Sequence, residues 1–527
     1  MANSATDLAS NRMSRATLGD QLRRHAQHQP DKPAVVFYHP TQGRQVVTYG
    51  QLDERANRYA QVLRSQGVGK GDVVAMMSRN SPDYIAVWYA SLKLGAPFTG
   101  VNFTFKTGEI AYQLNHCEAK VLVVEDAFVE QAEAARSELT SVVGHLVSDI
   151  GGRQLPEGWQ RLEDCTEDAV EPEVELDHHD LAMLQYTSGT EAYPKAVMIP
   201  HRNYLIATAP AWQAAIGIKP DDRWLFLMPF HTIAGLGSMT TLTQVGATLV
   251  LVHEIDPPKA LRMMADEAVT IMAQTPAFFI QMAQVEGLSD VDLDALERCI
   301  TYGGTMPGAM IDAWREAVPW LQWGTYWGQS ELTQLGSVGW FTSLDDVPDA
   351  DPTWIGKPVP QLEVRVVDED DNDAEIGELI CRSPAAMLGY YKDEQRTAQV
   401  FRDGWLRTGD VVRTDAAGNL FFYDRRKDMI KTGGMNVSSQ EVERVLFEHP
   451  DVLECAVIGV ADEYWSEAVT GFVVLREGST TTGEDVRSHC KEQMAGFKVP
   501  KEIHVVESLP RDTQGKLLKR ELRGVGR

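Results

Sequence analysis

Short apolar runs alternate with amphipathic stretches along most of this 527-residue chain, and this alternation constrains the fold more than any other feature. Strands that alternate with helices form right-handed βαβ units, whose largely parallel sheets are covered by helices on both faces. The pattern therefore predicts the α/β class. The predicted strands are 34–38, 73–77, 121–125, 224–228, 248–252, 271–273 and 299–302. The predicted helices are 49–66, 82–94, 108–116, 258–268 and 308–317.

The length exceeds what one hydrophobic core holds, so we expect at least two domains. We predict a large N-terminal domain, 1–427, with two βα-layered, parallel-rich sheets and a small β-barrel-like region. We predict a small, mobile α+β C-terminal domain, 428–527, in which Ser438 and Glu441 fit a capping box. Its predicted elements are helices 438–447 and 482–494 and strands 455–460, 468–475 and 503–505. We expect the first fifteen residues to be disordered.

The charge balance excludes several classes of partner. The formal net charge of −26 argues against nucleic acid and anionic membrane surfaces, and an anionic ligand would need local positive charge. No stretch reaches the roughly 20 apolar residues of a membrane helix, and the polar start of the chain predicts no signal peptide. The six scattered cysteines indicate reduced thiols in a cytoplasmic protein rather than disulfides or a zinc site.

A loop at 186–196 follows an apolar run and combines hydroxyls, a glycine and a lysine. Backbone N–H groups, hydroxyls and an ammonium in one turn form a cradle for an anion, most often a polyphosphate. The chain has no G-x-x-x-x-G-K-[ST] motif, so this is not the P-loop of NTPases. Ligands of doubly wound α/β sheets bind at the carboxyl ends of strands, where this loop is expected. Taken alone, the loop is equally compatible with a polar surface turn.

Five further motifs follow the loop in order. They are 302–307 (YGGTMP), 327–331 (WGQSE), 407–410 (RTGD), 424–434 (DRRKDMIKTGG) and 509–516 (LPRDTQGK). Together with the loop they resemble, over nearly the whole chain, the adenylate-forming superfamily of acyl-CoA synthetases, standalone adenylation domains and firefly luciferases. The resemblance is greatest to the acyl-CoA synthetases.

This resemblance implies a reaction in two steps. A carboxylic acid attacks the α-phosphate of ATP to give acyl-AMP and pyrophosphate, and the acyl group then passes to CoA. Because both reactants of the first step are anions, the site needs a cation between them, Mg²⁺ on the leaving pyrophosphate and fixed donors around the phosphates. The implied cofactors and co-substrates are ATP, Mg²⁺ and CoA.

The resemblance also implies roles for residues near the reacting atoms. Lys516 would be the catalytic lysine that bridges the carboxylate and the α-phosphate. Glu331 would ligate Mg²⁺, for which a carboxylate oxygen is a suitable ligand. Ser330, where the family usually has threonine, would bond the α-phosphate, and His231 would lie beside the incoming carboxylate.

The nucleotide would be held by a second group of residues. Asp410 would accept both ribose hydroxyls, and Arg425 would add a donor to the ribose or the phosphate. Trp327, where the family more often has tyrosine, or its neighbour Tyr326 would stack on adenine. The other residues implied to contact ATP or CoA are Thr187, Ser188, Gly189, Thr190, Lys195, Gly303, Gly304, Thr305, Lys431, Gly433 and Gly434.

Asp428 resembles the family's hinge, about which the C-terminal domain rotates between the two steps. One face of that domain would deliver Lys516, and the other, led by the loop 431–435, would close a tunnel for the thiol. The chain departs from the family pattern at Glu191, Ala192 and Ala196 in the phosphate loop. Asp424 replaces a glycine.

The leading hypothesis is an acid:CoA ligase for a bulky or long apolar acid, and the alternative is a standalone adenylation enzyme that loads an acyl carrier protein in trans. The stretch 230–235 lacks a carboxylate that could pair with an α-amine, which argues against amino acids. A luciferase-type oxidase and a binding protein without turnover are further alternatives, and the family is compatible with a homodimer. The expected acid pocket comprises Trp212, 230–239, 278–282, 303–306 and 330–336.

Overall fold

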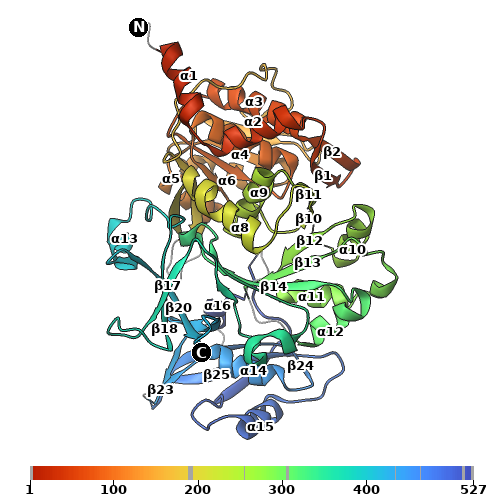
Figure 1. Cartoon of the computed structure of the whole chain (residues 1–527), viewed down its shortest axis with the longest axis vertical. Coiled ribbons are helices and arrows are strands. Elements are labelled where there is room, and N and C mark those ends of the chain that lie inside the picture. Colours follow the sequence, from red (N-terminus) through yellow and green to blue (C-terminus); the bar gives the residue numbers. More distant parts are fainter. Residues whose placement is uncertain are drawn as a thin grey trace.

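The structure is a computed structural model that describes residues 4–187, 194–254, 256–303, 308–433, 435–462, 464–512 and 517–523. Within them, two large sheets account for most strands before residue 360 (Figure 1). The nine-stranded sheet has the order β16-β15-β14-β13-β12-β10-β11-β1-β2, and its strands from β14 to β1 are parallel neighbours. Its strands are β1 (Pro33–His39), β2 (Gly43–Thr48), β10 (Arg223–Phe226), β11 (Thr248–Val252), β12 (Ile271–Gln274), β13 (Arg298–Tyr302), β14 (Gln322–Gly328), β15 (Gly336–Phe341) and β16 (Lys357–Pro358).

The seven-stranded sheet has the order β7-β6-β5-β3-β4-β8-β9 and is parallel except for the hairpin β8–β9. That hairpin pairs Thr187 with Lys195, so both ends of the predicted phosphate loop are fixed side by side. Its strands are β3 (Val73–Met77), β4 (Phe98–Gly100), β5 (Ala119–Glu125), β6 (Gly144–Ser148), β7 (Gln160–Arg161), β8 (Leu181–Thr187) and β9 (Lys195–Pro200).

Helices between the two sheets form the main core. Every residue of α4 (Pro82–Leu94) from Tyr84 onward is buried, as expected for a helix that is apolar on all sides. Ser81 caps its start and Gly95, in the left-handed conformation, ends it. The other helices before residue 401 are α1 (Ser4–Ser14), α2 (Leu18–His28), α3 (Tyr49–Ser65), α5 (Thr107–His116), α6 (Val129–Ala135), α7 (His201–Asn203), α8 (Ala209–Ala215), α9 (Ile233–Val245), α10 (Pro257–Asp266), α11 (Pro276–Ala283), α12 (Gly308–Ala317) and α13 (Glu394–Val400).

A third sheet of five antiparallel strands follows the nine-stranded sheet. It is the small β-rich region that the sequence predicts, and it pairs Asp410 with Arg425 across neighbouring strands. Its strands are β17 (Glu363–Val367), β18 (Ile376–Arg382), β19 (Phe401–Arg402), β20 (Trp405–Thr414) and β21 (Leu420–Arg425).

The last hundred residues form a separate α+β unit with its own apolar core, at the bottom of Figure 1. We retain 428 as the proposed start of this C-terminal domain, because its first strand begins at Ile430. Its strands are β22 (Ile430–Thr432), β23 (Met435–Val437), β24 (Val452–Asp462), β25 (Ser466–Leu475) and β26 (Glu502–Val505). Its helices are α14 (Ser439–Phe447), α15 (Gly483–Gln493) and α16 (Lys519–Leu522).

The predicted α/β architecture is confirmed, but the expectation of a disordered N-terminus is wrong. Residues 4–14 form α1, which Asn11 joins to the segment at Leu176 through hydrogen bonds in both directions. Arg15 Nη1 also donates to the Val174 carbonyl over 2.8 Å. These long-range contacts stabilise a helix whose sequence alone gives a weak signal.

Three smaller expectations have clear outcomes. The Ser438 hydroxyl caps α14 as predicted, but the Glu441 carboxylate pairs with Lys498 Nζ at 2.5 Å. All six cysteines are free and buried. No helix in the described ranges has both the length and the apolar character to cross a membrane.

We predict that Gly336→Ala destabilises the large domain. A Cβ at this position would lie 1.6 Å from the Trp327 carbonyl oxygen, so the β14–β15 pairing must shift. Overpacking of this kind lowers the free energy of unfolding by about 1–3 kcal/mol, or more where backbone must move. Urea unfolding followed by tryptophan fluorescence measures the effect.

Gly108→Ala is the matched control, because a Cβ there meets no atom within 4 Å. It should leave the unfolding midpoint unchanged or raise it slightly. Equal midpoints for the two variants would show that the close approach at Gly336 does not constrain the sheet.

Candidate active site

A cavity of about 1430 Å³ lies where the large sheets, the third sheet and the C-terminal domain meet. The hairpin β8–β9, helices α8 and α9 and the carboxyl ends of β12, β13 and β14 contribute to its wall. On the opposite side the wall includes Asp424–Asp428 and residues of the segment 511–523. The cavity therefore joins residues that lie more than 400 positions apart in the chain.

The cavity wall concentrates positive charge in an acidic protein. Ten lysines and arginines and eight acidic residues line it, whereas the whole chain has a net charge of −26. Local cations of this kind are what an anionic ligand requires against a repulsive overall field. The lining cations are Lys106, Lys195, Arg407, Arg425, Arg426, Lys427, Arg511, Lys519, Arg520 and Arg523.

Asp410 is a fully buried carboxylate immediately behind this wall. Trp327 Nε1 and Gln329 Nε2 each donate to its Oδ2 over 2.8 Å. Arg425 Nε lies 2.7 Å from Oδ1 but is not aligned with it, so among the described residues Oδ1 accepts no hydrogen bond. A buried acceptor without a donor is unfavourable, and the hydroxyl of a ligand could satisfy it.

Glu331 forms the second buried cluster, on a short 3₁₀ turn after β14. Lys195 Nζ lies 3.0 Å from Glu331 Oε1, and the Tyr390 hydroxyl donates to the same oxygen over 2.8 Å. Lys195 also donates to the Tyr390 hydroxyl over 2.5 Å. Burial alone would raise the pKa of Glu331, but Lys195 and Tyr390 outweigh it and hold that pKa below its usual value. Glu331 is therefore an anion inside the cavity.

Glu331 fits a magnesium site supplied partly by the ligand. Both of its cavity contacts go to Oε1, and a carboxylate has about four acceptor positions on two oxygens. Mg²⁺ is usually held by one or two carboxylates, substrate phosphates and several waters. A single buried glutamate beside a polyphosphate is compatible with that pattern.

His231 lines the cavity as a neutral imidazole. Burial lowers the pKa of His231 to about 3, and its ring lies edge-to-face against Phe103 with centroids 5.3 Å apart. Gln185 Nε2 donates to the His231 main-chain carbonyl over 3.1 Å. His231 can therefore exchange a hydrogen bond with a carboxylate, but it cannot act as its cation near neutral pH.

Several predicted contacts lie outside the described residues, namely Ser188, Gly189, Thr190, Gly304, Thr305, Gly434 and Lys516. Their described neighbours do line the cavity, including Thr187, Lys195, Gly303, Asp512 and Leu517. The Thr187 hydroxyl is buried and has no partner within the described ranges, and Gly303 has a φ of 75° that favours glycine. Ser330 also lines the cavity.

Two predicted site residues lie elsewhere, and the stretch 278–282 of the expected acid pocket does not line this cavity. Lys431 and Gly433 are on the C-terminal domain and are not among the residues that line this cavity. The Gly433 N–H donates to the Trp465 carbonyl over 2.8 Å. In this arrangement of the domains, the two residues do not meet the group around Asp410 and Glu331.

Three aromatic residues that line the cavity pack against one another. Trp212 of α8 stacks on Trp224 of β10 with ring centroids 6.2 Å apart, and it meets Tyr326 edge-on at 5.6 Å. Trp212 Nε1 donates to the Tyr326 hydroxyl over 3.0 Å, and that hydroxyl donates in turn to the Gln334 carbonyl. The Tyr326 ring is thus held on the apolar side of the cavity, next to Trp212, whereas Trp327 lies against Asp410.

Sequence reasoning missed two residues that hold the site. Gln329 supports Asp410, and its place inside the motif 327–331 could have revealed it. Tyr390 supports both Lys195 and Glu331, but no motif surrounds it. Asp428, the predicted hinge, lies 3.4 Å from Arg523 Nη2, so the hinge turn contacts the end of the described chain.

Comparisons with known proteins agree with this geometry. A family model for AMP-binding enzymes matches residues 22–391, and a model for the AMP-binding enzyme C-terminal domain matches 441–516. The chain is 32% identical over 520 residues to the indoleacetate–CoA ligase of Aromatoleum aromaticum, covering 96% of this chain and 97% of that protein. It is 30% identical over 488 residues to the long-chain-fatty-acid–CoA ligase FadD13 of Mycobacterium tuberculosis, covering 90% of this chain and 92% of that protein. The solved structure of the anthranilate CoA ligase AuaEII with anthranoyl-AMP matches with a TM-score of 0.86 at 28% identity, over 97% of each chain.

We predict that His231 stays neutral well below the usual histidine range. Its pKa is lowered, so below about pH 6.5 the unfolded chain binds a proton that the folded chain does not bind until about pH 3. The unfolding free energy therefore falls with decreasing pH in this window, by up to about 1.4 kcal/mol per pH unit from this group. NMR of the histidine ring resonances, with His231→Gln to assign the signal, should show no titration above pH 5. A midpoint between pH 6 and 7 would contradict the burial argument.

Proposed function

Because this chain belongs to the AMP-binding enzyme family, we propose that its cavity activates a compact, ring-bearing apolar acid. The chain is an ATP-dependent, AMP-forming acid:CoA ligase that uses Mg²⁺ and takes CoA as co-substrate. The observation that supports the choice of acid is the aromatic group Trp212, Trp224 and Tyr326 that lines the cavity.

The reaction requires two displacements. In the first, a carboxylate oxygen of the acid forms a bond to the α-phosphorus of ATP, and the bond from that phosphorus to pyrophosphate breaks. In the second, the thiol sulfur of CoA forms a bond to the acyl carbon, the bond to AMP breaks, and the thiol proton is released. Mg²⁺ supplies charge neutralisation on the leaving pyrophosphate.

We assign nucleotide binding to the two buried carboxylate clusters. Asp410 Oδ1, which accepts no hydrogen bond within the described ranges, would take the ribose hydroxyls, with Arg425 beside it. Trp327 lines the cavity with its indole N–H fixed on Asp410, so its ring would present a constant face to adenine. Glu331 would hold Mg²⁺, and Thr187 and Lys195 would contact the phosphates.

We assign the acid to the apolar side of the cavity. His231 and Ser330 would lie at its carboxylate end, and Lys516 would bridge the carboxylate and the α-phosphate. Trp212 is 4% exposed and Trp224 is fully buried, so the rings pack on each other instead of opening a channel. A long alkyl chain would have to displace them, whereas a planar or fused ring system fits against them.

Two relatives act on aromatic acids according to their names, indoleacetate and anthranilate, and a third acts on long-chain fatty acids. The aromatic group Trp212, Trp224 and Tyr326 favours an aromatic acid over a long-chain fatty acid as the substrate of this chain. The six buried, free cysteines support a reducing cytoplasmic location.

We predict that ring acids are better substrates than chain acids. Purified protein is incubated with Mg-ATP and one member of a panel of aryl, indolyl, bicyclic and C8–C16 fatty acids, with and without CoA, and products are quantified by mass spectrometry. The best ring acid should exceed every fatty acid at least tenfold in kcat/KM and give acyl-CoA and AMP. A fatty acid at the head of the panel would overturn the proposed acid class. Acyl-AMP that never reaches CoA would favour a carrier protein as acceptor.

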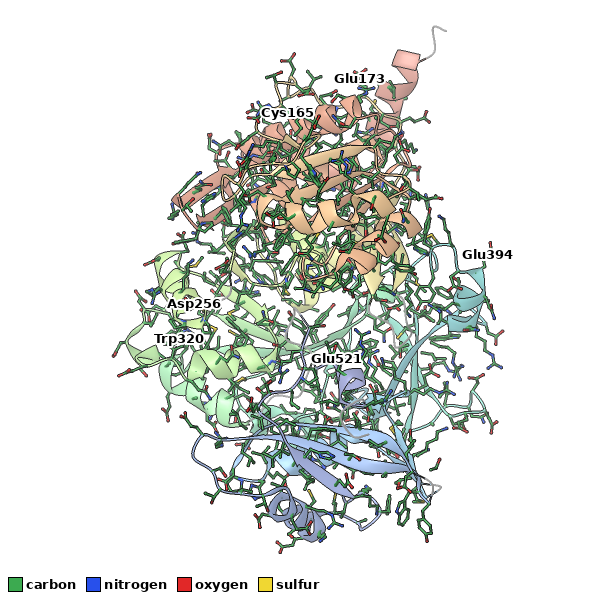
Figure 2. All side chains as sticks on the ribbon, turned by 180° about the vertical axis from the view of Figure 1, so that it is seen from behind. Cys165, Glu173, Asp256, Trp320, Glu394 and Glu521 are labelled. Atoms are coloured by element: carbon green, nitrogen blue, oxygen red, sulfur yellow. The ribbon has the colours of Figure 1, made fainter. Side chains whose placement is uncertain are left out.

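The same panel with Trp212→Ala tests the aromatic group directly. Removing the indole opens the cavity beyond Tyr326, so the ratio of fatty-acid to ring-acid kcat/KM should rise at least tenfold. The matched control is Trp320→Ala, because Trp320 is half-exposed and lies at the outer edge of the molecule (Figure 2). An unchanged ratio in Trp212→Ala would show that the three rings do not set the acid length.

A further inference from the structure

A buried ionic network lies beside the cavity, in the C-terminal domain, and the roles assigned above do not use it. Lys519 Nζ lies 2.7 Å from Glu443 Oε1 and donates to Ser439 Oγ over 2.6 Å. The Lys519 and Glu443 side chains are only 12% and 9% exposed. Glu443 accepts two further hydrogen bonds, from the Val457 N–H at Oε1 and from Gln440 Nε2 at Oε2. The pair is therefore well satisfied despite its burial.

Asp424 extends this network into the large domain. Its Oδ2 accepts the Ser439 N–H over 2.6 Å and the Ser439 hydroxyl over 2.8 Å, and its Oδ1 accepts the Arg425 N–H over 2.7 Å. Asp424 is the penultimate residue of β21, before the proposed hinge at Asp428, whereas Ser439 begins α14 after it. The chain of contacts from Lys519 through Ser439 to Asp424 thus joins the two sides of the hinge.

The segment around Lys519, residues 517–523, is held at several other points. We call it the tail. Leu517 pairs with Arg511, and the Leu518 N–H donates to the Pro510 carbonyl over 2.9 Å. Leu522 is buried, and Arg523 contacts Asp428. The tail contributes six residues to the cavity wall, namely Leu517, Leu518, Lys519, Arg520, Glu521 and Arg523, and Figure 2 shows Glu521 in the middle of the molecule.

The bridged Lys519 is close in the sequence to Lys516, the lysine proposed to act in acyl-AMP formation. Three residues span at most about 11 Å when fully extended. Lys516 is three residues before Lys519 in the sequence, so the anchor is close along the chain to the proposed catalytic lysine. A displacement of about 1 Å in a catalytic group can lower a rate by roughly 100-fold.

We propose that Lys519 is a positioning residue for acyl-AMP formation. Its bridge to Glu443 and Ser439 fixes the tail, and Asp424 fixes that bridge relative to the large domain, so the segment that follows Lys516 in the sequence keeps its place in the cavity wall. The proposal rests on the role of Lys516 in the proposed function. It assigns no bond-forming step to Lys519 itself, whose Nζ is held by Glu443 and Ser439.

The test separates the two half-reactions. Acyl-AMP formation is measured from acid and Mg-ATP in the absence of CoA, and acyl transfer is measured from supplied acyl-AMP and CoA. Lys519→Met should lower kcat of acyl-AMP formation at least 100-fold and keep KM for ATP within threefold of wild type. It should leave the rate of acyl transfer within threefold of wild type. Lys519→Arg, which keeps the charge, should recover at least a tenth of the wild-type rate of acyl-AMP formation.

Three further variants complete the test. Lys491→Met is the matched control, because Lys491 lies on α15 and is 46% exposed, and it should leave both half-reactions unchanged. Asp424→Asn keeps the size of the side chain and the Lys519–Glu443 pair, and should lower acyl-AMP formation at least fivefold without changing acyl transfer. It decides the question if Lys519→Met does not fold. Lys516→Ala should abolish acyl-AMP formation only.

The outcomes distinguish the two proposals. If Lys516→Ala retains acyl-AMP formation, the assigned role of Lys516 is wrong. If Lys516→Ala loses it but folded Lys519→Met, or otherwise Asp424→Asn, stays within twofold of wild type, the positioning role alone is overturned. Equal losses in both half-reactions would also overturn it, because they indicate a general structural effect.

Discussion

Repulsion between two anionic reactants is the constraint on which the rest of this molecule depends. A carboxylate must approach a triphosphate in a chain whose own net charge is −26. The structure meets this constraint locally, by collecting cations from the seven-stranded sheet, the third sheet and the C-terminal domain around one cavity. Two of these cations are held by partners: Lys195 contacts Glu331 and Tyr390, and Arg425 contacts Asp410. These two cations are therefore already fixed before a ligand binds. Fixed charges need no reorganisation during the reaction, and this is why a preorganised site stabilises the transition state more than water does.

The same constraint explains why the C-terminal domain takes part. A lysine placed permanently between the two reactants would also obstruct the thiol that reacts next. In the proposed function Lys516 belongs to the C-terminal domain, and rotation of that domain about the proposed hinge would withdraw it before the thiol reacts. The contacts of Asp424 with Ser439 and of Arg523 with Asp428 involve residues near the proposed hinge. Both contacts stabilise the present orientation of the C-terminal domain.

Much of the fold could be predicted from the sequence, because buried strands appear as short apolar runs and helices as stretches in which apolar residues recur with helical spacing. The strands at β3 and β11 and the helix α4 have the predicted bounds. The helix α1 was missed because long-range contacts to the segment at Leu176 stabilise it, and local sequence does not carry such contacts.

The candidate site could be predicted only where its residues lie in motifs. Asp410, Glu331, Thr187 and Lys195 were found in this way, and the structure brings all four to one cavity or its wall. Trp212 was expected in the acid pocket although it lies in no motif, and it does line the cavity. Tyr390 was not predicted, because its role arises from tertiary packing against Glu331. Lys519 was missed for a different reason: it lies just past the last motif and looks like a surface lysine until its burial against Glu443 is known.

The central claim is that a carboxylate oxygen of the acid attacks the α-phosphorus within this cavity. An acid labelled with ¹⁸O at both carboxylate oxygens tests it most directly, in a reaction with Mg-ATP and CoA followed by mass spectrometry of AMP and pyrophosphate. The account predicts one ¹⁸O atom in each AMP and none in pyrophosphate. Unlabelled AMP, or label in pyrophosphate, would contradict it.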